Sequence, residues 1–260
     1  MRKTFKYMVI LTCGLLLTGC IVCSFVAGKA ARLPLRCEGL EVVIADSLEN
    51  SFVTRADVKK YLDKEYGTYI GTPLDSLDLT KIEKIIDGRS AVHKSQAYVT
   101  RDGILHISVT QRKPVVRFQR PDGGFYADAE GYIFPLQNTY ASHVQVIDGN
   151  IPLAANSGYK GAIEDPKEKE WFDRVISLIN FMEGSRMWKD KIVQISVAQD
   201  GNLTLIPRVG QERFLFGQPV KIGEKFGKME KYYTSITPEK GLTYYKTVDL
   251  RYDGQIVCRK

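Results

Sequence analysis

An uncharged run at residues 7–27 constrains this chain more than any other feature of its sequence. Basic residues flank the run on both sides, namely Arg2, Lys3, Lys6, Lys29 and Arg32. A helix of this length, at about 1.5 Å per residue, spans roughly 30 Å, the thickness of the hydrocarbon core of a bilayer. Positive charge before the run favours an N-terminus in the cytoplasm. We therefore predict a cytoplasmic stub (1–6), a single transmembrane helix (7–27) and a tether (28–36), with the rest of the chain exported.

The same stretch has a second interpretation. Leu17-Thr18-Gly19-Cys20 resembles a bacterial lipobox, in which the signal is cleaved and Cys20 carries lipid. Residues 21–27 stay apolar, however, whereas a lipoprotein usually continues at once into a polar tether. We favour the uncleaved anchor and keep a periplasmic adaptor lipoprotein as the alternative. Both interpretations place the bulk of the protein outside the cytoplasm.

The charge and the cysteines exclude several function classes. The net charge is +7, but acidic residues lie among the basic ones nearly everywhere, so we expect no nucleic-acid partner. Cys37 and Cys258 are the cysteines of the exported part. A disulfide between them is possible, but their spacing does not indicate one, and we favour two small hydrophobes. No Cys/His cluster predicts a metal site, and we expect no cofactor.

The first exported segment, residues 37–115, predicts the order strand, helix, helix, strand, strand. Thr54 and Asp57 have the spacing of a capping box, and Asp78 precedes the second helix. Asp102-Gly103 predicts a hairpin turn. Such an order packs two helices on one face of a three-stranded sheet. The expected elements are a strand at 40–44, helices at 54–67 and 78–88, and strands at 94–100 and 105–110.

The second segment, residues 116–260, predicts a mixed, β-rich domain with one long packing helix. Asp165 is the expected N-cap of that helix, with Pro166 at its first position and Glu168 completing a capping box. Its apolar face is too broad for a coiled coil and should lie on a sheet; it comprises Trp171, Phe172, Val175, Ile176, Leu178, Ile179 and Met182. Further strands are expected at 192–197, 202–207 and 211–216, and a helix at 221–235. The overall class is α+β.

The C-terminal segment, residues 248–259, alternates apolar and polar side chains. Val248, Leu250 and Tyr252 share one face, and Asp249 and Arg251 share the other. We expect a strand at the edge of a sheet, where a partner strand can pair with its free N–H and C=O groups. Arg251 would bind a partner carboxylate and Tyr252 would be a flat anchor. Two alternatives remain open: one long strand, or a hairpin hinged at Gly254.

The chain resembles the FtsQ/DivIB family of bacterial cell-division proteins. Residues 103–115 resemble the last strand of the family's POTRA domain and its exit, with Gln111 where the family usually has Glu. Residues 126–135 are similar to a family hairpin, and residues 144–149 occupy the place of another family segment but lack its proline. Near the C-terminus, the chain matches a family motif at Val248-Asp249-Leu250-Arg251-Tyr252. A tryptophan that some members carry beyond this motif is absent.

The resemblance implies a non-enzymatic divisome scaffold that links early and late division proteins. Its expected place is the inner membrane at the septum, with the N-terminus in the cytoplasm and the bulk in the periplasm. The C-terminal β-domain would bind FtsB in complex with FtsL, and the POTRA domain and membrane helix would contact other division proteins. Carried over by position, the partner-binding residues are Asp249, Arg251, Tyr252, Asp253 and Gly254.

An exported enzyme is the main rival class. His93, His106 and His143 lack the neighbouring Ser, Cys or Glu arrangements that would activate a nucleophile or hold zinc. Asp128 and Glu130 are more typical of a turn beside Gly131 than of a glycosidase pair. We therefore expect no catalytic residues. A POTRA protein of the transport type is a weaker rival, because this chain has one POTRA copy and no barrel-length tail.

Overall fold

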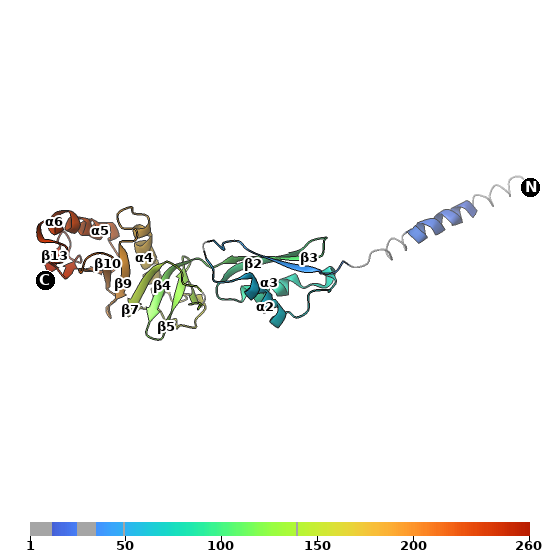
Figure 1. The fold of residues 1–260 in the computed structure, drawn as a ribbon, viewed down its shortest axis with the longest axis horizontal. Coiled ribbons are helices and arrows are strands. Elements are labelled where there is room, and N and C mark those ends of the chain that lie inside the picture. The colour runs from blue at the N-terminus through green and yellow to red at the C-terminus, as the bar shows by residue number, and fades with distance from the viewer. Residues whose placement is uncertain (1–11, 25–34, 49, 139) are drawn as a thin grey trace, which may run out of the picture.

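The computed structural model describes residues 12–24, 35–48, 50–138 and 140–260 (Figure 1). Residues 12–24 form a helix whose apolar side chains are largely exposed, including Leu16 at 70%. In the described part of the chain, no helix is both long and apolar enough to cross a membrane. The remaining residues of the predicted span, 7–11 and 25–27, lie outside the described residues, as do the predicted stub and most of the tether.

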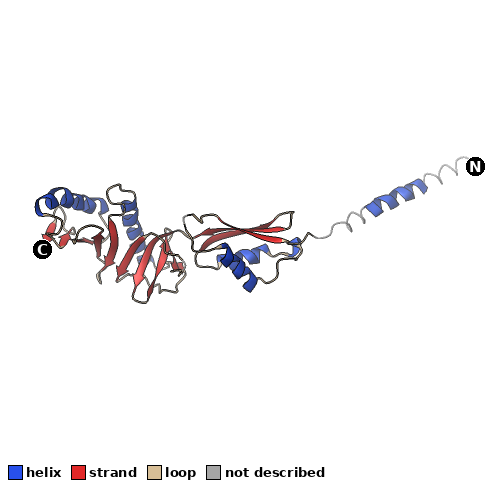
Figure 2. Cartoon of the chain, in the orientation of Figure 1, coloured by secondary structure: helices blue, strands red, loops and turns tan. Residues whose placement is uncertain are grey.

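The first part, residues 35–111, forms a three-stranded sheet with two α-helices on one face (Figure 2). Strand order is β1-β3-β2, with β1 parallel and β2 antiparallel to β3. The predicted order of strand, helix, helix, strand, strand is confirmed, with one short 3₁₀ turn between the helices. The elements are β1 (Gly39–Ile44), α2 (Arg55–Glu65), η1 (Leu74–Ser76), α3 (Leu79–Asp87), β2 (Val92–Val99) and β3 (Ile104–Gln111).

Both helices begin at the predicted caps. The Thr54 hydroxyl accepts a hydrogen bond from the Asp57 N–H (3.2 Å), and the Asp57 carboxylate accepts one from the Thr54 N–H (3.0 Å). The Asp78 carboxylate accepts one from the Lys81 N–H (2.9 Å). These bonds satisfy N–H groups that have no partner inside a helix. The helices then bury Val58, Leu62, Ile82 and Ile86 completely against the sheet.

The second part is built on a ten-stranded mixed sheet of order β13-β12-β11-β10-β9-β7-β4-β5-β6-β8. The pairs β4–β7, β7–β9 and β11–β12 are parallel, and the others are antiparallel. The strands are β4 (Pro114–Arg120), β5 (Gly123–Asp128), β6 (Tyr132–Pro135), β7 (Gln145–Gly149), β8 (Gly161–Ala162), β9 (Ile192–Val197), β10 (Leu203–Pro207), β11 (Arg213–Gly217), β12 (Thr247–Asp249) and β13 (Val257–Arg259). The helices are α4 (Pro166–Glu183), α5 (Ile222–Lys231) and α6 (Thr237–Lys240), with a π-helical turn η2 (Tyr232–Ile236) between the last two.

Helix α4 lies on this sheet as predicted, and all seven side chains of its expected apolar face are buried. Asp165 caps the helix by accepting hydrogen bonds from the N–H groups of Lys167 (2.8 Å) and Glu168 (3.0 Å). The predicted role of Glu168 is wrong. Its carboxylate accepts from the Ala154 N–H (3.1 Å), so it ties the preceding loop to the helix where a capping box would reach back to the N-cap.

The helix predicted at residues 221–235 is interrupted. Helix α5 ends at Lys231, and a π-helical turn follows. The extra residue in a π turn lets Tyr232 and Tyr233 both face the sheet. Tyr232 packs edge-on against Phe214 with 5.5 Å between ring centroids, and the Tyr233 hydroxyl donates to the buried Glu212 carboxylate at 2.7 Å. Sequence periodicity alone does not reveal such an insertion.

Aromatic side chains join the two parts. Phe52, which is 5% exposed, leaves the first part and packs edge-on against Tyr126, Phe134 and Tyr140 of the second. Arg112 adds an ion pair to the Asp128 carboxylate (2.9 Å) and lies 3.4 Å from the centroid of the Tyr132 ring. The two parts therefore share a packed junction.

Gln111 organises the loop that carries Phe52. Its side-chain oxygen accepts from the Val53 N–H (2.8 Å), and its amide nitrogen donates to the Asn50 carbonyl (2.8 Å). The side chain is buried, so both its donor and its acceptor need partners. A glutamate here would lack the donor, which explains why this chain uses the amide.

Replacing Phe52 with alanine should lower the free energy of unfolding by about 3–5 kcal/mol, because a large buried side chain leaves a cavity at the junction. Urea unfolding measures the loss, and amide exchange should accelerate around Tyr126 and Phe134. Phe181→Ala is the control, since Phe181 is 38% exposed and lies away from the junction. Equal losses for the two variants would contradict a junction that depends on Phe52.

Candidate functional site

The C-terminal segment is a hairpin and not one long strand. β12 stops at Asp249, the chain turns at residues 252–254, and β13 returns to pair with β12. The register places Val248 opposite Cys258 and Thr247 opposite Arg259. Gly254 adopts φ = 69°, a conformation that favours glycine. Of the two alternatives that the sequence left open, the structure has the hairpin; we call residues 247–259 the terminal hairpin.

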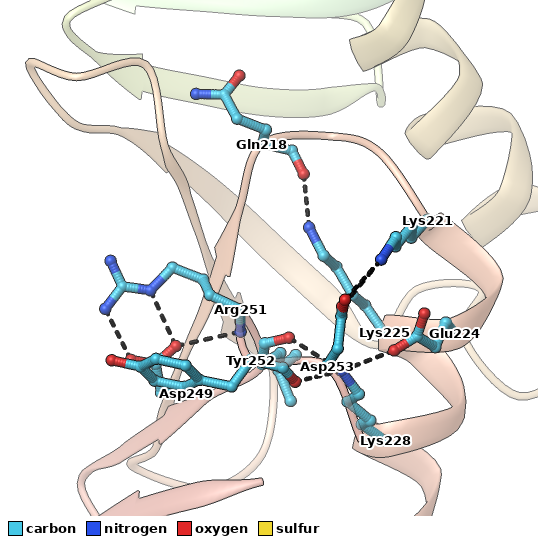
Figure 3. Close-up of polar contacts among 10 residues, drawn as sticks. Gln218, Lys221, Glu224, Lys225, Lys228, Asp249, Arg251, Tyr252 and Asp253 are labelled. Carbon is cyan, nitrogen blue, oxygen red and sulfur yellow. Dashed lines mark hydrogen bonds and ion pairs between the residues drawn. The ribbon is translucent and has the colours of Figure 1, made fainter. Parts of the chain in front are cut away.

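Asp249 and Arg251 form an ion pair at the end of β12 (Figure 3). The Asp249 carboxylate is fully buried and accepts from Arg251 Nε (2.9 Å), Nη2 (2.7 Å) and the backbone N–H (3.2 Å). These hydrogen bonds hold the pKa of Asp249 below its usual range, and the carboxylate raises the pKa of Arg251. In this conformation the Arg251 fork, which we expected to face a partner carboxylate, binds a carboxylate of its own chain.

Gly217 makes room for the Arg251 side chain. It ends β11 with φ = 74°, and a Cβ atom there would lie 2.8 Å from Arg251 Cγ. Any larger residue at position 217 would push the arginine away from Asp249. Residue spacing does not predict this contact, because Gly217 and Arg251 are far apart along the chain.

Lysines of α5 and its N-cap bond the turn of the hairpin and the loop before the helix (Figure 3). Lys221 forms an ion pair with Asp253 (2.9 Å), and Lys225 donates to the Gln218 carbonyl (2.7 Å). Lys228 donates to the Tyr252 carbonyl (2.7 Å) and pairs with Glu224 (2.9 Å). Burial lowers the pKa of Lys225, while Asp253 raises the pKa of Lys221. Sequence reasoning missed these lysines, although their spacing of four and three residues places them on one helix face.

The turn of the hairpin is the exposed part of the predicted site. Tyr252 is 48% exposed whereas Val248 and Leu250 are buried. The prediction that the three share one face is therefore wrong, because the strand ends before Tyr252. Arg251, Asp253 and Gly254 are exposed as well, whereas Asp249 is buried. The structure thus gathers the five predicted residues in one hairpin but divides them into a buried anchor and an exposed turn.

Two family models match the chain. One, described as "FtsQ/DivIB, C-terminal related", covers residues 113–259, more than half of the chain. The other, a POTRA-like domain, covers residues 35–110. The chain belongs to the FtsQ/DivIB-related family. No curated protein matches it. The FtsQ/DivIB family consists of non-enzymatic, membrane-anchored scaffolds of bacterial cell division, which assigns this chain a coarse role in division.

His106 and Asp128, two side chains with catalytic potential, have structural partners in this FtsQ/DivIB-related chain. His106 stacks on Tyr98, and its Nδ1 lies 3.3 Å from a Glu41 carboxylate oxygen. Asp128 accepts from the N–H groups of Glu130 (3.2 Å) and Tyr132 (2.8 Å), which confirms its predicted role in a turn. Among the residues that the structure describes, no cluster of three or more His, Cys, Asp or Glu could hold a metal ion. Cys37 is buried, Cys258 is half-buried, and both are free.

Replacing Arg251 with alanine should lower the free energy of unfolding by about 2 kcal/mol, because it leaves a buried carboxylate without its main donors. Arg251→Lys should lose less, since it keeps one charge but not the bidentate fork. Urea unfolding measures both.

Arg174→Ala is the matched control for that series. Arg174 also pairs with a carboxylate and has a similarly exposed side chain (45% against 41% for Arg251), but its partner Glu170 is itself exposed. Such a surface pair contributes about 0.5 kcal/mol or less. If Arg251→Ala lowered the free energy of unfolding no more than Arg174→Ala, the ion pair of Asp249 with Arg251 would not stabilise the fold.

The stability that Asp249 contributes should depend on pH. Because its pKa is lower in the folded chain than the usual value of about 3.9, the contribution is complete above that value and is lost as the pH falls through the folded pKa. The difference in unfolding free energy between wild type and Asp249→Asn should therefore be large at neutral pH and shrink toward pH 3. A difference that stays constant over this range would show that the charge of Asp249 plays no part.

Proposed function

We propose that this chain is a non-enzymatic divisome scaffold of the inner membrane at the septum, which binds an FtsB/FtsL-type complex through the terminal hairpin. Family membership supports the scaffold role. The proposal of a docking surface depends on the shape of the hairpin. It ends the ten-stranded sheet with an unpaired strand edge and an exposed aromatic turn.

Residues 7–27 are the proposed membrane anchor, with the N-terminus in the cytoplasm. The described helix continues without a break through Cys20 to Ser24. No other part of the described chain buries its apolar side chains; Leu15 is 67% exposed and Val22 is 60% exposed. Such a surface is unfavourable in water and favourable in lipid. The mass of the mature N-terminus tests this, because a diacylated Cys20 would show the lipoprotein alternative.

The proposed docking mode is strand addition at the outer edge of β13. β12 lies on one side of β13, and no described strand pairs with its other side. The backbone groups of such an edge can bind an extended partner segment. Tyr252 adds a flat, half-exposed ring on the turn that leads into β13. Arg251 contributes by fixing the hairpin through Asp249, and Gly254 by permitting the turn.

The POTRA domain offers a separate surface to other division proteins. The sheet face opposite α2 and α3 carries exposed apolar side chains on both edge strands, with Val43 (44%) on β1 and Tyr98 (51%) on β2. With the membrane helix, this face is the proposed contact for recruitment.

Tyr252→Ala should weaken binding to an FtsB/FtsL-type complex about tenfold or more, because the turn loses its aromatic anchor. Co-purification with the partner and septal localisation of a fluorescent fusion measure the effect. Tyr98→Ala, which removes a similarly exposed tyrosine from the POTRA sheet, should leave co-purification with this complex unchanged. Unchanged binding by Tyr252→Ala would refute the proposed site.

A disulfide lock separates addition to β13 from displacement of β13. Thr247 and Arg259 are opposite in the antiparallel register, at a spacing that cysteines can bridge. Thr247→Cys with Arg259→Cys, in a Cys258→Ser background, should bind the partner equally well when oxidised and when reduced. Binding only after reduction would mean that the partner strand replaces β13, and would overturn addition to its outer edge.

A further inference from the structure

An apolar pocket lies at the end of the ten-stranded sheet opposite the hairpin turn. The register of the ladder brings the start of β9 next to the end of β10, and the start of β12 next to the end of β13. A cavity of about 440 Å³ opens there. Trp188 and Tyr233 belong to its wall, and three exposed apolar side chains border it, namely Met187 (36%), Val209 (65%) and Leu242 (40%).

The wall of this pocket is held in place from within the domain. The Trp188 ring packs on Phe226 (5.0 Å between centroids) and on Tyr233 (6.2 Å). The Tyr233 hydroxyl donates to the buried Glu212 carboxylate (2.7 Å). The pocket thus lies between the turn at residues 186–191, β9, β10 and the π turn, and the contacts of Trp188 and Tyr233 fix its wall.

Basic side chains surround the opening. Two of them, Arg186 and Lys191, line the pocket itself, and its lining includes no acidic residue. Others follow on the same end of the sheet, namely Lys189, Arg208, Arg213 and Lys246. None of these six is ion-paired to a carboxylate in the described part of the chain. The nearby acidic residues are the exposed Glu183, Asp190 and Glu239 and the buried Glu212, so the basic side chains remain in excess.

We propose that this basic end is a second docking surface, which binds an acidic segment of a partner protein with a bulky apolar side chain in the pocket. The volume and apolar wall fit a Phe or Leu side chain, and the cations around the opening fit flanking carboxylates. An anionic membrane is a poorer match, because the apolar groups form a concavity where membrane insertion needs protruding side chains. The surface is at the end of the sheet away from the 252–254 turn, so it goes beyond the docking site proposed above.

The test uses the full chain in nanodiscs of zwitterionic lipid and a fluorescent peptide with a central Phe-Leu pair between glutamates. Wild type should bind this peptide, and binding should weaken with salt. Arg186→Glu with Lys191→Glu, and separately Leu242→Asp, should weaken binding about tenfold or more. Lys59→Glu with Lys60→Glu, which reverses two exposed charges on α2, should leave the affinity unchanged.

Comparison peptides and vesicles complete the test. A peptide with Gln for every Glu, or with Ser for Phe and Leu, should bind at least about tenfold more weakly. The proposal would be overturned if these peptides bound as tightly as the Glu and Phe-Leu peptide, or if the variants bound that peptide as tightly as wild type. Capture of the nanodiscs by phosphatidylglycerol vesicles without peptide binding would also overturn it. The mutated side chains are exposed, and unchanged circular dichroism with normal exchange protection in β12 will show that each variant is folded.

Discussion

The buried carboxylate of Asp249 determines how this chain ends. A charged group without access to water needs close partners, and it finds them two residues away in the backbone N–H and guanidinium of Arg251. That local bond turns the backbone away from the ladder after three residues of β12. The tail therefore cannot continue as one long edge strand. It folds back, and β13 becomes the last strand of the sheet.

Lys228 of α5 connects the hairpin to the domain core. Lys228 donates to a carbonyl group at the turn, where the strand ladder no longer supplies a partner. The helix that carries this lysine is itself fixed to α4 by the stacked rings of Phe181 and Phe226. The hairpin is consequently part of the packed domain, and its exposed turn is presented in a defined position. A docking surface of this kind binds with little loss of conformational entropy.

The sequence predicted those elements whose determinants are local. The caps at Thr54, Asp78 and Asp165 and the broad apolar face of α4 were predicted correctly, because each depends on residues within a few positions of one another. The end of β12 was not predictable from alternation alone. It depends on a buried carboxylate, on Gly217 in another strand and on lysines from a helix. Glu168 shows the same limit, since its spacing fits a capping box but a loop amide competes for it.

The junction between the two parts connects the surfaces of this scaffold. Phe52 and the Arg112–Asp128 pair fix the POTRA sheet to β5 and β6, and the continuous ladder leads from there to β13. Hydrogen-bonded strands in one sheet hold their spacing, whereas a flexible linker would let each partner move independently. A scaffold gains from such a connection, because a partner that binds one surface then has a fixed distance to a partner on another. The buried amide of Gln111, which needs both its donor and its acceptor in the Phe52 loop, shows that the junction is specified by particular residues and is not an accidental contact.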